Sequence, residues 1–128
     1  NERNRLIGKL NSGLINSIWL QFGSELNNLK REINFMQEIK KKFFEDKKNN
    51  IELYGSIFIP SKQSLARFKF RPWPGVFLSN EYLNSIEKST LITKKIINLY
   101  LKSNIIPLIE SECSSEKQFA EVRKFIKL

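Results

Sequence analysis

The chain has 128 residues, with 22 Lys and Arg against 13 Asp and Glu, for a formal net charge of +9. Hydrophobic residues make up 41% and charged residues 27%, which argues against a disordered chain and is enough to build one core. We therefore expect a single domain over residues 1–128, helical over 1–47, with a sheet at 51–78 and helices again at 80–128. A protein this basic is expected to meet an acidic partner.

The chain contains no histidine, which excludes Ser/His/Asp and Cys/His nucleophilic systems, imidazole acid/base catalysis and metal sites with histidine ligands. The single cysteine, Cys113, cannot form a disulfide within the chain, so we expect a reducing compartment, cytoplasmic or the interior of an organelle. The chain starts at Asn1 and its only methionine is Met36. The expected compartment therefore allows for a targeting peptide that was lost before Asn1.

An apolar stripe with steps of three or four residues runs through residues 7–43 and predicts an amphipathic helix. One continuous helix over 1–47 would be longer than a compact domain of this size, so we weigh it against a helical hairpin. The hairpin would break near Gly23, and Ser24 would cap its second helix. The stripe is also a candidate contact with a protein partner or a second copy, through Phe22, Leu26, Leu29, Ile33 and Met36.

The hydrophobic period changes to two after the first helical part. Apolar and polar residues alternate over 51–59 and predict a β-strand. A second run, 66–71, places Phe68 and Phe70 on one face and basic residues on the other. The two runs predict an antiparallel hairpin, to which 76–78 would add a third strand. Because a hairpin alone is marginal in water, its apolar face is expected to pack on the helices.

Helical spacing returns over 80–102, with Ser79 or Asn80 as the residue that caps the helix. Glu81 after them suits the positive end of the helix dipole. A restart of the helix within this segment is expected at residue 89 or 90.

The closing helix is predicted to begin at Ser115, because Gln118 three residues later completes a capping box. A short apolar turn at 108–109 precedes it. The chain as a whole is expected to have an α+β fold, with a long N-terminal amphipathic helix or helical hairpin. A two- to three-stranded antiparallel sheet and two to three C-terminal helices complete it.

No Walker loop, dinucleotide-binding glycine pattern or calcium loop occurs in the sequence, and its acidic residues suggest no catalytic pair. We therefore expect no enzyme, no cofactor and no metal site, and we name no catalytic residue. Cys113 lies between Glu112 and Ser114 and is expected to be a small, partly buried residue, since acidic neighbours raise the pKa of a thiol.

The excess positive charge lies in the middle of the chain, between nearly neutral flanks at 1–39 and 103–128. Bases alternating along one strand face, with a tryptophan at its end, would hold a phosphate backbone and stack a base. A solvent-facing edge strand explains the same alternation, because lysine there prevents aggregation. The residues expected to contact an acidic partner or nucleic acid are Lys40, Lys41, Lys42, Lys62, Arg67, Lys69, Arg71 and Trp73.

Two hypotheses follow from these patterns. The first is a non-catalytic accessory subunit or assembly factor, which binds an acidic partner through the basic hairpin and a protein partner through its N-terminal helix. The second is a protein that binds RNA or single-stranded nucleic acid with the basic hairpin face. Contact with a membrane surface is not expected at Lys40–Lys42, because lysines at a helix C-terminus complement the helix dipole.

Overall fold

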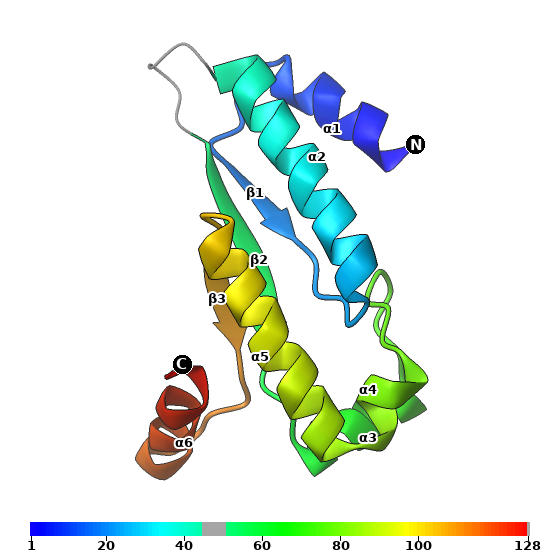
Figure 1. Ribbon diagram of the computed structural model, residues 1–128, viewed down its shortest axis with the longest axis vertical. Coiled ribbons are helices and arrows are strands. Elements are labelled where there is room, and N and C mark those ends of the chain that lie inside the picture. The colour runs from blue at the N-terminus through cyan, green and yellow to red at the C-terminus, as the bar shows by residue number, and fades with distance from the viewer. Residues whose placement is uncertain (45–50, 128) are drawn as a thin grey trace.

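A three-stranded parallel sheet forms the centre of the computed structural model, which describes residues 1–44 and 51–127 (Figure 1). The strands lie in the order β1-β2-β3, and both neighbouring pairs are parallel. Parallel strands need a long crossover, and a helix lies in each crossover here. The strands are β1 (Ser17–Leu20), β2 (Glu52–Phe58) and β3 (Ile106–Glu110).

The helices are α1 (Glu2–Leu10), α2 (Leu26–Phe44), α3 (Lys62–Phe70), α4 (Asn80–Asn84), α5 (Ile86–Lys102) and α6 (Glu116–Ile126). Helix α2 connects β1 to β2, while α3, α4 and α5 connect β2 to β3. Because the strand order runs in one direction, right-handed crossovers place α2 and α5 on the same face of the sheet. Figure 1 shows α5 in front of the sheet and α2 beside it.

The helix-covered face of the sheet carries the core. Ile18 and Leu53 are register partners on this face, and both are buried. Gly55 follows on the same face of β2, where the ring of Tyr100 from α5 packs directly against it. Helix α5 therefore contacts the sheet at its centre.

Helix α2 lies against α5 and is itself covered by α1. Gln37 Nε2 donates a hydrogen bond of 3.2 Å to the carbonyl oxygen of Ser103, at the end of α5. From α1, Arg3 pairs with Glu32 at 2.9 Å, and its guanidinium lies 4.3 Å from the centre of the Phe35 ring.

The opposite face of the sheet is covered at one end only. Trp19, Tyr54 and Ile106 form a row across the three strands, and Trp19 and Ile106 are exposed. Towards the ends of the strands, Phe58 is buried beneath Phe68 of α3, with ring centres 5.3 Å apart. Helix α3 therefore covers the end at which the strands finish and leaves the Trp19 row open.

The predicted antiparallel hairpin is wrong, because the chain folds into α3 where its second strand was expected. Ser61 and Ser64 form a reciprocal capping box that starts this helix. Leu65 and Phe68 are three residues apart and buried, whereas Phe70 is 93% exposed. In so short a segment, a pair of apolar residues three apart fits a helix as well as alternation fits a strand. The expected strand at 76–78 is reduced to one parallel bridge between Phe77 and Gly23.

The long N-terminal helix is also wrong. Helix α1 ends at Leu10, and Gly13 in the turn that follows has a φ of +70°, which a helix cannot continue through. The next element is β1, and α2 begins at Leu26. The alternative, a helical hairpin with its break near Gly23, is wrong as well, because a strand and not a helix precedes this glycine. Residues 45–47 of the predicted helical part lie outside the described residues.

The local signals for helix starts in the C-terminal half were more reliable. Ser79 caps α4 and Ser115 caps α6, as predicted. The restart occurs at Ser85, which caps α5, and not at residue 89 or 90. The apolar turn predicted at 108–109 is part of β3.

Candidate functional site

A cleft lies where the strands of the sheet end. The chain leaves β1 and β2 at this edge, and in parallel sheets the carboxyl ends of the strands are where ligands usually bind. The segment 71–79 crosses this edge between α3 and α4. Its backbone is hydrogen-bonded to the loop that follows β1, because the Ser24 amide donates to the Phe77 carbonyl at 3.1 Å and the Ser79 amide donates to Ser24 Oγ at 2.7 Å.

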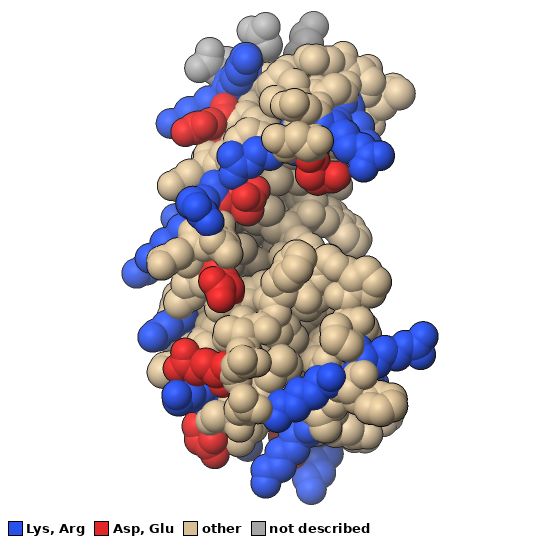
Figure 2. Space-filling view, turned by 90° about the vertical axis from the view of Figure 1, so that its right-hand side faces the viewer, with Lys and Arg blue, Asp and Glu red and all other residues tan. Residues whose placement is uncertain are grey.

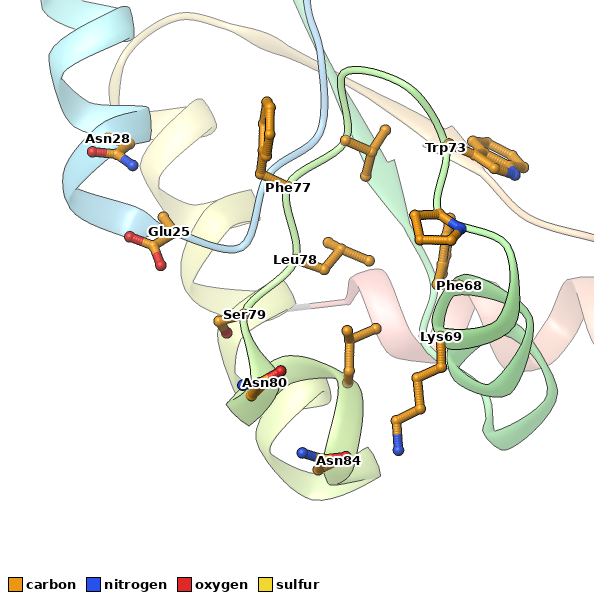
Figure 3. A pocket seen from close by; sticks show the side chains of 13 residues that line it. Glu25, Asn28, Phe68, Lys69, Trp73, Phe77, Leu78, Ser79, Asn80 and Asn84 are labelled. Atoms are coloured by element: carbon orange, nitrogen blue, oxygen red, sulfur yellow. The ribbon is translucent and has the colours of Figure 1, made fainter.

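The cleft has a volume of about 820 Å³, within the range typical of ligand sites. Its floor is apolar, with Phe68 and Val76 buried and Leu78 and Leu83 half-buried. Polar and charged side chains surround this floor (Figure 3). They are Glu25, Asn28, Lys69, Ser79, Asn80 and Asn84.

A second, smaller hollow of about 360 Å³ lies on the other side of Phe68 and Trp73, which contribute to both. The two rings pack edge to face, with centres 5.2 Å apart, and form the wall between the hollows. Across the smaller hollow, Arg67 pairs with Glu112. The guanidinium of Arg67 is therefore already engaged within the chain.

The basic residues of α3 point in different directions, because successive residues of a helix are turned by about 100°. Arg67 faces the smaller hollow, while Lys69 lines the cleft. Lys69 and Arg71 are exposed and make no ion pair within the described part of the chain. Figure 2 shows Lys and Arg side chains gathered at the lower right, around α3.

Two aromatic side chains accompany these two cations. Phe70 is 93% exposed and Trp73 is 44% exposed. We call Lys69, Phe70, Arg71 and Trp73 the basic aromatic tip. Phe70 was predicted to lie in the core. This prediction is wrong, because Phe70 is one of the two exposed rings of the tip.

The other predicted cations are not part of this site. Lys40, Lys41 and Lys42 lie in the last turns of α2, at the far end of the molecule from α3 (Figure 1). Lys42 lies 5.7 Å from the centre of the Phe43 ring. Lys62 lies at the start of α3, where it lines a shallow hollow with α4 and α5. The basic middle of the sequence is thus divided between two ends of the structure.

The residues predicted to bind a protein partner lie inside the chain. Phe22, Leu29, Ile33 and Met36 are buried in the core, and Leu26 packs against it. Their side chains already contact the sheet and the other helices, so no partner is needed to cover them. Cys113 is partly buried.

The sequence did not indicate Glu25, Asn28, Asn80 and Asn84 as site residues. Asn80 and Asn84 belong to α4, Asn28 lies in the first turn of α2, and Glu25 directly precedes α2. Only the crossing of segment 71–79 brings these two helices together at the cleft. The one local signal for this crossing is the turn from Pro72 to Gly75, where the chain changes direction after α3. Gly75 has a φ of +81° there.

Comparison with known proteins gave no match with a family model, a curated protein or a solved structure. Among the described residues, no helix is both long and apolar enough to cross a membrane. In the same part of the chain, no group of three or more acidic or cysteine side chains could hold a metal ion.

Proposed function

We propose that the protein binds single-stranded nucleic acid, RNA in the first instance, through the basic aromatic tip. The observation that carries this proposal is the proximity of two cations without an ion pair in the described part of the chain, Lys69 and Arg71, to two exposed rings, Phe70 and Trp73. Proteins that hold single strands combine cations along the backbone with rings on which bases stack. The tip has both components within five residues of the sequence.

An acidic protein is the alternative partner for the same cations. It would pair with Lys69 and Arg71 but would leave the exposure of Phe70 unexplained, since a carboxylate gains little from an aromatic face. A base gains about 1–3 kcal/mol from stacking on a ring. The rings therefore favour nucleic acid. We also propose that the protein works in a reducing compartment, the cytoplasm or the interior of an organelle. A nucleic-acid ligand and a single cysteine both fit such a compartment.

The proposal is tested by fluorescence anisotropy with a labelled RNA of about ten nucleotides, within the range of about 4–16 nucleotides that OB folds cover when they bind single strands. The double variant Lys69→Glu/Arg71→Glu should weaken binding at least tenfold. It should also lower the slope of log affinity against log salt concentration by about two, because about two fewer counterions are released on binding. Lys41→Glu/Lys42→Glu makes the same change in net charge at the far end of α2 and should have a much smaller effect.

Phe70→Ser tests the aromatic half of the tip. It should weaken binding about fivefold or more without changing the slope of affinity against salt, because it removes stacking and no charge. The proposal fails if the wild-type protein does not bind at low salt. It also fails if the two double variants weaken binding equally, since this would show that only the total charge matters.

A further inference from the structure

We infer that the cleft at the carboxyl edge of the sheet receives one unstacked base of the bound strand. This inference rests on the proposed function and adds a second, base-reading component to it. Lys69 belongs both to the basic aromatic tip and to the lining of the cleft. A strand whose phosphates are held at Lys69 and Arg71 therefore passes the opening of the cleft.

The apolar part of the cleft suits the faces of a flat ring. Figure 3 shows Leu78 and Phe68 projecting into the same space from opposite sides, the first from segment 71–79 and the second from α3. The ring of Trp73 packs edge to face against Phe68 and stays 44% exposed. A base leaving the strand would bury its faces against these side chains, as unstacked bases do against apolar and aromatic walls.

The polar part of the cleft suits the edges of a base. Three asparagines line it, and each amide offers both a donor and an acceptor. Within the described part of the chain, the amides of Asn80 and Asn84 make no hydrogen bond, whereas Asn28 accepts one from Arg31. Amides with both functions free are the side chains that pair with the edge of adenine.

The charges around the cleft favour a neutral ring with a phosphate outside it. Lys69 and Asn84 lie at one end of the cleft, and both also line the hollow next to it (Figure 3). Glu25 lies on the other side of segment 71–79, where its exposed carboxylate would repel an anion at that end of the cleft. The phosphate is therefore expected outside the cleft at Lys69, and the base inside it with one edge towards Asn84.

The test compares an oligoadenylate with an abasic strand of equal length and charge. Trp73 reports on the cleft once Trp19, on the open face of the sheet, is replaced by Phe; the reverse variant, Trp73→Phe, keeps only the distant ring. The wild-type protein should bind the oligoadenylate at least fivefold more tightly than the abasic strand. Trp73 emission should change on binding, and Trp19 emission should not.

The variant Asn84→Leu removes one free amide and leaves every charge in place. It should reduce the preference for the oligoadenylate over the abasic strand without changing binding of the abasic strand. Asn98→Leu, at an exposed position of α5 outside the cleft, is the matched control and should keep the full preference. Circular dichroism of both variants shows that the fold is retained.

The outcomes separate the two proposals. If Asn84→Leu keeps the full preference, the inference about the cleft is overturned while binding at the tip stands. If both strands bind equally well, the inference is overturned together with the stacking of bases on the rings of the tip. If neither strand binds at low salt, the proposed function is overturned and the inference with it.

Discussion

The ring of Tyr100 occupies the space in which any residue larger than glycine at position 55 would place its Cβ. Gly55 lies in the middle of the sheet, in register with Leu20 on one side and Pro107 on the other. Tyr100 is completely buried. Helix α5 therefore reaches the sheet at the one position of β2 that carries no side chain.

Gly55→Ala should lower the free energy of unfolding by about 1–3 kcal/mol, because the new methyl group must displace a packed ring and its helix. Urea unfolding followed by circular dichroism measures this loss. Gly8→Ala in α1 is the control, since a Cβ there meets nothing within 4 Å. It should raise stability by up to about 1 kcal/mol through helix propensity. Equal effects of the two variants would contradict the packing of Tyr100 on Gly55.

Tyr100→Phe should stabilise the protein by about 1 kcal/mol. The Tyr100 hydroxyl is buried without a hydrogen-bond partner in the described part of the chain, and an unmet hydroxyl is costly to bury. Tyr82→Phe is the contrasting variant, because the Tyr82 hydroxyl lies 3.3 Å from Thr93 Oγ1. Its loss should destabilise by about 1 kcal/mol. A destabilised Tyr100→Phe protein would show that the hydroxyl does have a partner.

Stability should fall steeply above pH 10. Burial raises the pKa of Tyr100 and Tyr82 above the ordinary value of 10.0, so the unfolded chain releases their protons first. Their stabilising contribution is complete below pH 10 and is lost as the pH rises through the folded-state values. A hydrogen bond with Glu52 also raises the pKa of Tyr54. Phenolate absorbance in the folded protein below pH 10 would contradict this prediction.

Phe68→Ala should cost about 3–5 kcal/mol, whereas Phe70→Ala should change stability by less than about 0.5 kcal/mol. The two positions are two residues apart, which places them on different sides of α3, one buried and the other 93% exposed. On a strand they would share one face and lose similar amounts. Chemical unfolding of the two variants therefore distinguishes the helix from the hairpin that the sequence suggested.

The candidate site could be predicted only in part. The sequence indicated Lys69, Arg71 and Trp73 because they are close together in the chain. Two cations and an aromatic ring are also the side chains that bind single-stranded nucleic acid. Phe70 was misplaced because its exposure depends on whether the segment is a helix or a strand. Asn80 and Asn84 join the site through the hydrogen bond between the Ser79 amide and Ser24 Oγ, two residues that are 55 positions apart in the sequence.

The sequence by itself determined where two of the helices begin. Ser79 and Ser115 cap their helices as predicted, since a cap depends on a side chain and a backbone amide only three residues apart. The tertiary structure alone decided that the sheet is parallel and that 66–70 is helical. Strand direction depends on which crossover carries the chain back, and the conformation of a short apolar run depends on the surface that it covers. Both depend on residues far away in the sequence, although the capping box of Ser61 and Ser64 marks locally where α3 begins.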